Sequence, residues 1–131
     1  TLFDTADTYG DGYGEAVLSK ALGKRRQDIV LATKCGYDIY SGEARQGHRE
    51  RTQNFTPEFI RHACEQSLRR LKTDYIDLYQ LHNPRLEAIR RDDVFDTFKA
   101  LIEVSKWEHD VSKTVIGKTP VDPIQTETGA N

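Results

Sequence analysis

Three short apolar runs, each close to a residue of catalytic type, constrain the fold of this chain more than any other feature. The runs are Leu2–Ala6, Ile29–Thr33 and Tyr75–Leu81. The run Ile29–Thr33 has no polar alternation, which is typical of a strand buried in a parallel sheet, the third run is largely apolar, and a helical pattern follows each of the three. The sequence therefore predicts an α/β fold in which parallel strands alternate with helices through right-handed crossovers.

The segments between the runs carry helix signals. Thr56-Pro57-Glu58 is a strong helix start, because the hydroxyl caps the first N–H groups and proline has no N–H to leave unpaired. We expect helices over Glu15–Leu22, from Thr56-Pro57-Glu58 to at least Leu71, and over about Asp93–Ser105. Their expected buried faces consist of Val17, Leu18, Ala21 and Leu22, then Ile60, Ala63, Cys64, Ser67, Leu68 and Leu71, and finally Val94, Phe95, Phe98, Leu101 and Ile102.

Two stretches lack such patterns. Gly36 to Phe55 is polar and has no periodicity. We expect it to be an irregular loop of about 20 residues, partly mobile, on the substrate side of the molecule. After Lys106 the sequence predicts a fourth strand at Lys113–Ile116 and then an extended or disordered tail.

Composition excludes several classes of function. The 131 residues suit one domain, and 37% hydrophobic with 31% charged residues is a globular composition. The net charge of -2 and the lack of a basic run argue against nucleic acid as a partner. No apolar run reaches the roughly 18 residues of a membrane span, so we expect neither a membrane partner nor a leader. Cys35 and Cys64 lack metal-ligand spacing, so we expect reduced thiols, no metal site and a cytoplasmic protein.

The ends of the three runs carry the residues that point to chemistry. Asp4 lies near the end of the first run and Tyr9 on the turn after it. Lys34 ends the second run and His82 the third. Parallel strands place these ends on one rim, where α/β proteins hold their active sites. We expect the four side chains to form a proton-donating site that reduces carbonyls, because hydride addition leaves an oxyanion that needs a proton.

Several motifs resemble the aldo-keto reductase family, most closely its bacterial and plant branches related to potassium-channel β subunits. They are Phe3-Asp4-Thr5-Ala6-x-x-Tyr9-Gly10, Leu31-Ala32-Thr33-Lys34 and Leu68-x-x-Leu71-x-x-Asp74-Tyr75-Ile76-Asp77-Leu78-Tyr79-Gln80-Leu81-His82. The resemblance implies a (β/α)8 TIM-barrel fold, of which this chain supplies about four βα units. Residues 1–105 would form the partial barrel and residues 106–131 a divergent tail. It also implies the reduction of aldehydes or ketones with NADPH.

The same resemblance implies a catalytic tetrad of Asp4, Tyr9, Lys34 and His82. Tyr9 is the expected proton donor. A free phenol has a pKa of about 10 and is a weak acid at neutral pH, so it needs a nearby cation. Lys34 would supply that cation, and Asp4 would keep the ammonium charged and aimed. His82 would hydrogen-bond to the carbonyl oxygen and orient the substrate.

Three further residues are weaker candidates. Asn83, together with Asp4 in a second role, is expected to contact the nicotinamide cofactor. Tyr13 and Tyr37 are expected to line the substrate pocket, although ordinary packing roles stay open for both.

Two alternatives to a reductase remain open. In the barrel of the family, this stretch would begin at the second strand and stop near the fifth, so its sheet would have open edges. The alternative function is therefore a non-catalytic half-barrel or pseudoenzyme that acts as a regulatory or assembly partner. Another alternative is self-association that restores the sheet, which makes a homo-oligomer possible. The partner expected of a reductase is a small carbonyl substrate.

Overall fold

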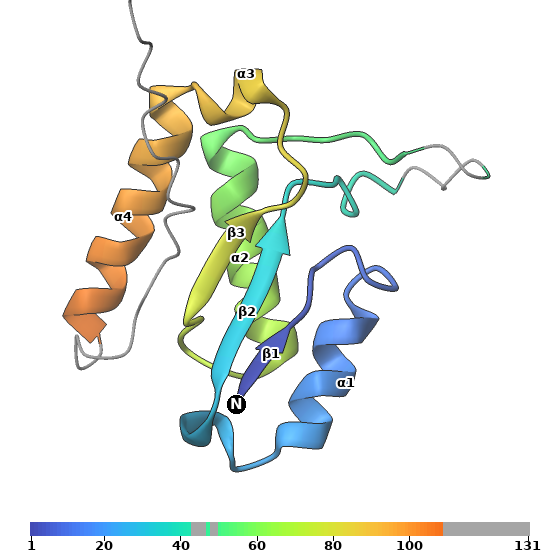
Figure 1. The fold of residues 1–131 in the computed structure, drawn as a ribbon, viewed down its shortest axis with the longest axis vertical. Coiled ribbons are helices and arrows are strands. Elements are labelled where there is room, and N and C mark those ends of the chain that lie inside the picture. The colour runs from blue at the N-terminus through green and yellow to red at the C-terminus, as the bar shows by residue number, and fades with distance from the viewer. Residues whose placement is uncertain (43–46, 48–49, 109–131) are drawn as a thin grey trace, which may run out of the picture.

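A parallel three-stranded sheet forms the centre of the structure, a computed structural model that describes residues 1–42, 47 and 50–108 (Figure 1). Its strands are β1 (Leu2–Asp4), β2 (Val30–Cys35) and β3 (Leu78–Leu81), with β2 in the middle. All pairings are parallel, so the C-terminal ends of the strands share one rim. The predicted α/β class with a parallel sheet is confirmed, whereas the predicted fourth strand lies outside the described residues.

A helix follows each strand. The helices are α1 (Tyr13–Leu22), α2 (Pro57–Leu71) and α4 (Asp92–Glu108). The short helices η1 (Arg26–Asp28) and α3 (Leu86–Ile89) were not predicted. In Figure 1, α2 lies behind the sheet, between α1 on one side and α4 on the other, and it contacts both helices and β2.

Helix α2 forms as its sequence predicts. The Thr56 hydroxyl accepts a hydrogen bond from the Phe59 N–H at 3.3 Å, and Pro57 occupies the first helical position. The buried residues of α2 are Phe59, Ile60, Ala63, Ser67 and Leu71. This stripe covers the sheet and gives α2 its central place in the core.

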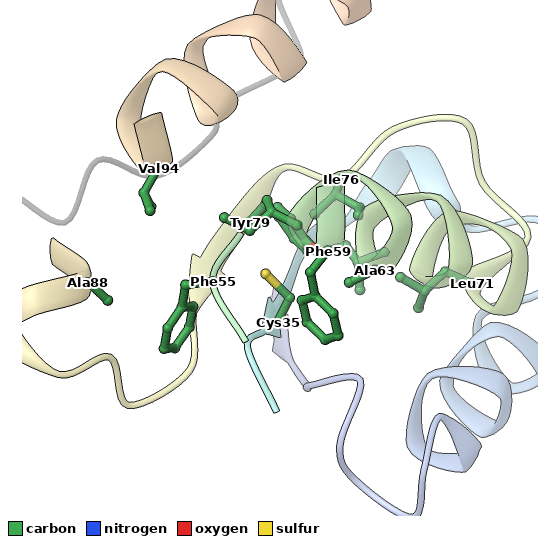
Figure 2. Packing of buried hydrophobic residues seen from close by; sticks show 11 residues of the cluster. Cys35, Phe55, Phe59, Ala63, Leu71, Ile76, Tyr79, Ala88 and Val94 are labelled. Carbon is green, nitrogen blue, oxygen red and sulfur yellow. The ribbon is translucent and has the colours of Figure 1, made fainter. Parts of the chain in front are cut away.

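Side chains alternate between the two faces of the sheet. Leu31 and Cys35 of β2 and Tyr79 of β3 point to the helix side and join the core. Figure 2 shows Cys35, Tyr79, Phe59 and Ala63 gathered in this layer. The core continues through Phe55, Ala88 and Val94 toward α3 and α4.

The opposite face of the sheet carries the polar residues of the rim. Asp4 pairs in register with Ala32, so Asp4, Ala32 and Lys34 lie on this face. No described helix covers it, and Leu2 and Val30 are 58% and 47% exposed. The prediction that the first run is buried was wrong for β1, because this edge strand pairs only with β2 among the described residues.

Two predicted helix faces differ from the structure. Val17 of α1 and Phe95 of α4 are exposed, at 44% and 47%. In α1 the inward stripe runs through Glu15, Leu18 and Leu22, at spacings of three and four residues. The buried acid Glu15 therefore takes a place that hydrophobicity alone assigned to an apolar residue.

The long polar segment after β2 is ordered at its base. Tyr37 and Gln53 form an antiparallel bridge, and the Asn54 N–H donates to the Gly36 carbonyl at 2.7 Å. The Asp38 N–H also donates to the Thr52 carbonyl, at 2.8 Å. The prediction of a wholly irregular loop was therefore wrong at both ends of the segment, because local sequence does not reveal this pairing.

Candidate active site

Lys34 and Asp4 form an ion pair at the rim, on neighbouring strands. The Lys34 ammonium donates to both carboxylate oxygens of Asp4, each at 2.7 Å, and to the Thr5 carbonyl at 2.9 Å. The Lys34 side chain is 17% exposed and that of Asp4 is 52% exposed. Three acceptors therefore hold the ammonium in one place while the carboxylate stays open to solvent.

The turn after β1 holds Tyr9 beside this ammonium. Gly10, Asp11 and Gly12 all have positive φ angles, of 60°, 52° and 92°. Such a turn needs glycine, and Gly14 packs so closely that an added Cβ would lie 3.1 Å from the Tyr9 Cβ. As a result, the Lys34 ammonium lies 5.8 Å from the centre of the Tyr9 ring, and Tyr9 is 47% exposed.

His82 completes the group from the end of β3. Its N–H donates to the Cys35 carbonyl at 2.8 Å, which continues the pairing of β3 with β2 by one residue. The imidazole packs edge-on against Tyr9, with ring centroids 5.8 Å apart, and against Tyr37 at 5.0 Å. Burial, with the Lys34 charge as a second cause, lowers the pKa of His82, so the ring is neutral at pH 7.

Tyr37 and Asn83 lie next to His82 and are linked to each other by a hydrogen bond. The Tyr37 hydroxyl donates to the Glu50 carboxylate, and the Asn83 amide donates to the Tyr37 hydroxyl at 3.3 Å. The Gln53 amide donates to the carbonyls of His82 and Asn83, at 3.2 and 2.9 Å. Asn83 takes a positive φ of 47° there, so Gln53 supports a strained turn directly after His82.

The structure thus brings together Asp4, Tyr9, Lys34 and His82, with Tyr37 and Asn83 next to them. Tyr13 is different, because it begins α1 with its side chain 71% exposed. The described residues contain no cluster of three potential metal ligands, and both cysteines are free thiols. None of the described helices has the length and apolarity of a membrane span.

The aldo/keto reductase family model matches residues 1–107. The chain belongs to the aldo/keto reductase family. The fold of that family is the (β/α)8 barrel, and the sheet and helices described above are a part of it.

Aldo-keto reductases of known sequence or structure match over part of their length. YqkF, an uncharacterized oxidoreductase of Bacillus subtilis (strain 168), is 39% identical over 79% of this chain and 31% of its own length. The holo form of aldo-keto reductase AKR11C1 from Bacillus halodurans is 41% identical, with a TM-score of 0.67, over 79% of this chain and 33% of that one. An aldo-keto reductase from Klebsiella pneumoniae in complex with NADPH is 31% identical, with a TM-score of 0.59, over 81% of this chain and 31% of that one. The chain spans about a third of the length of these aldo-keto reductases.

Sequence reasoning missed two sets of residues around the site of this aldo-keto reductase chain. Gln53 binds Asn83, 30 residues away in sequence, and Glu50 binds Tyr37, 13 residues away. Hydrogen bonds over such distances leave no pattern in the local sequence. Asp7 and Glu15 are fully buried acids. Glu15 did have a signal, because it shares the inward stripe of α1 with Leu18 and Leu22.

Proposed function

We propose that this chain carries the proton-transfer half of an NADPH-dependent aldehyde or ketone reductase, with Tyr9 as the proton donor. The observation that supports this most is the meeting of four groups at one rim. They are the Asp4–Lys34 ion pair, the Tyr9 phenol and the His82 imidazole. Each comes from a different strand or turn, so their meeting depends on the fold rather than on proximity in sequence.

Lys34 is the group that would make Tyr9 an effective acid. An ammonium beside a phenol stabilises the phenolate that proton donation leaves behind. The hydrogen bonds from Lys34 to Asp4 and to the Thr5 carbonyl hold the ammonium charge in place before the reaction. The ammonium therefore does not have to move while the proton is transferred. Asp4 is therefore a positioning residue for Lys34.

His82 would hold the carbonyl oxygen of the substrate. Its Nδ1 atom is buried, and no described residue hydrogen-bonds to it. An N–H buried without an acceptor is disfavoured, so the proton of the neutral ring belongs on Nε2. Nε2–H can then donate to the oxygen that develops negative charge, next to the Tyr9 hydroxyl that protonates it.

The groups at the rim suit the nicotinamide end of a dinucleotide. Asn83 presents a carboxamide beside His82, which matches the donor and acceptor of a nicotinamide amide, and the Asp4 carboxylate is open to solvent. When bound, NADPH supplies a hydride to the carbonyl carbon. Tyr9 then gives its proton to the oxygen, so that an alcohol forms and the phenolate remains. The Klebsiella pneumoniae relative in complex with NADPH supports this choice of cofactor.

Oxidation of NADPH with a panel of aldehydes and ketones tests this function, and parallel assays with NADH test the cofactor. We expect Tyr9→Phe to lower turnover roughly 100-fold or more, because it removes the acid and keeps the ring. Tyr75→Phe is the matched control and should leave turnover unchanged, since Tyr75 lies before β3, at the opposite end of the sheet from the rim, and Arg26 contacts its ring. Turnover that survives Tyr9→Phe would refute the proposed role of Tyr9.

The alternative of a non-catalytic half-barrel or pseudoenzyme that acts as a regulatory or assembly partner stays a prediction; among the described residues β1 pairs with β2 alone, and its three residues are exposed. It predicts that no carbonyl compound oxidises NADPH in the presence of the wild-type protein. The cytoplasmic location, the homo-oligomer, the small carbonyl substrate and the boundary between residues 1–105 and 106–131 stay predictions.

A further inference from the structure

The carboxyl group of Asp7 has an environment unlike that of any residue used so far. Asp7 is fully buried, and among the described residues no side chain donates a hydrogen bond to either of its side-chain oxygens; the backbone N–H of Thr8 is the one nearby donor that favours its charge. An ionised carboxylate is disfavoured in such a place, because it loses its water and gains little in return. The physical expectation is a carboxyl group that keeps its proton.

A second buried acid lies against the same end of β2. The Thr33 hydroxyl donates to one Glu15 oxygen at 2.6 Å, and Arg70 donates to the other, also at 2.6 Å. The next residue of β2, Lys34, accepts a hydrogen bond from the Asp7 N–H through its carbonyl, at 3.1 Å. Arg70 therefore already neutralises Glu15, and a second negative charge at Asp7 would lack a dedicated cation.

Groups from several elements act on the charge of Asp7. Glu15 of α1 raises the pKa of Asp7, whereas Arg70 of α2, Arg51 of the segment after β2 and the Thr8 N–H lower it. The Asp7 charge in turn raises the pKa of Tyr40, of Cys35 in β2 and of Tyr79 in β3. Arg51 is itself paired with Asp11, at 2.9 Å. The pKa of Asp7 is raised to about 7, mainly because the carboxyl group is buried and secondly because of the Glu15 charge.

The backbone of Asp7 links it to the candidate site. Its N–H holds the carbonyl of Lys34, and two residues later the Tyr9 N–H closes a turn on the Ala6 carbonyl, at 3.2 Å. The Gly10–Gly12 turn and the close approach of Gly14 leave Tyr9 little freedom of its own. A change in charge at Asp7 must therefore be accommodated by the end of β2 or by the turn that carries Tyr9.

We propose that Asp7 is a positioning residue that works as an uncharged acid. Loss of its proton to solvent would shift the backbone that holds Tyr9 and Lys34 in position at the rim. This role rests on the reductase site proposed above, but its test needs no turnover. The transition would fall in the neutral pH range, well above the ordinary aspartate pKa of about 4.

An NMR titration of the wild-type protein, labelled with ¹³C at the aspartate carboxyl carbons, tests the proposal. From about pH 5 to about pH 9, we expect the Asp7 carbon and the backbone amides of Tyr9 and Lys34 to shift with one common midpoint near 7. An Asp7 midpoint near the ordinary aspartate value of about 4 would overturn the proposal. Amides of Tyr9 and Lys34 that do not move with Asp7 would overturn it too.

The substitution Asp7→Asn keeps the shape of the side chain and removes the ionisation. In this variant the Tyr9 and Lys34 amides should lose the transition with a midpoint near 7, and any response that remains should follow the signals of the His82 ring beside Tyr9. The matched control is Asp28→Asn, the same change at an exposed residue of η1, and it should leave the midpoint as in the wild type. If Asp7→Asn does not fold, the wild-type titration decides alone. A shared midpoint in a protein that reduces no carbonyl would uphold this proposal and refute the proposed function.

Discussion

The two ends of the sheet carry ion pairs of the same chemistry, but they use them in opposite ways. At the N-terminal ends of β2 and β3, Arg26 pairs with Asp77 at 2.8 Å, and both side chains are only 14% exposed. The same guanidinium donates to the Tyr75 carbonyl and lies 3.8 Å from the centre of the Tyr75 ring. At the rim, Lys34 pairs with Asp4, which is half exposed.

The two ion pairs differ in how much of each pair is exposed to solvent. Asp77 also accepts a hydrogen bond from the Leu31 N–H at 2.8 Å, so the Arg26–Asp77 pair joins two strands through groups that all have protein partners. At the rim, the Tyr9 ring and the Asp4 carboxylate remain accessible to a ligand. The closed end, formed by Arg26 and Asp77, is nearly shut off from solvent, and the open end, the rim with Asp4 and Tyr9, is exposed to it.

Breaking the closed end should give the largest change in stability. We expect Arg26→Met to lower the free energy of unfolding by about 2–4 kcal/mol, because it leaves Asp77 partly buried without its cation. Urea unfolding followed by circular dichroism measures this change. Lys99→Met, at an exposed helix pair, is the control and should have no measurable effect. A loss below about 1 kcal/mol for Arg26→Met would show that this end is not the stabilising one.

The pH dependence of the unfolding free energy tests the buried carboxyl group of Asp7. The pKa of Asp7 is raised to about 7 in the folded protein, against about 4 for an ordinary aspartate. Between these values the unfolded chain loses the proton while the folded protein keeps it, so stability falls as pH rises from about 4 to about 7 and is level above. The fall amounts to a few kcal/mol at most, at about 1.4 kcal/mol for each pH unit.

Comparison with Asp7→Asn isolates this contribution, because the other titrating groups cancel in the difference between the two proteins. Relative to the wild type, the variant should become more stable as pH rises through that range. A difference in unfolding free energy that does not change with pH would contradict the assignment of a raised pKa to Asp7.

A smaller effect is expected at the turn after His82. Gln53→Leu removes the two hydrogen bonds that hold the His82 and Asn83 carbonyls, and should lower the free energy of unfolding by about 1–2 kcal/mol. It should also shift the NMR signals of the His82 ring. Gln27→Leu, at an exposed position of η1, is the control. Unchanged His82 signals in Gln53→Leu would mean that the rim does not depend on this support.

The parts of the fold that depend on local signals could be predicted from the sequence. The apolar runs located β1, β2 and β3, and the Thr56 cap with Pro57 located the start of α2. The predicted third strand began at Tyr75, but the structure begins β3 at Leu78. Arg26 binds the carbonyl and the ring of Tyr75 and pairs with Asp77, so the first residues of the apolar run contact Arg26 and lie outside the strand.

The parts that depend on distant partners could not be predicted. The burial of Glu15 requires Arg70, 55 residues away, and the support of His82 requires Gln53, 29 residues away. An isolated acid or amide in a sequence is more often on the surface. The gathering of Asp4, Lys34 and His82 could be predicted, because parallel strands bring their ends to one rim whatever the details of packing.

The claim that Tyr9 and Lys34 act as one unit is tested most directly by a double-mutant cycle on turnover. Tyr9→Phe, Lys34→Met and the double variant are compared with the wild type at saturating aldehyde and NADPH. We expect each single change to lower kcat roughly 100-fold or more, and the double variant to be no slower than the slower single one, because an ammonium has no role once the phenol is gone. Two losses that multiply, or a single variant with wild-type turnover, would contradict the claim.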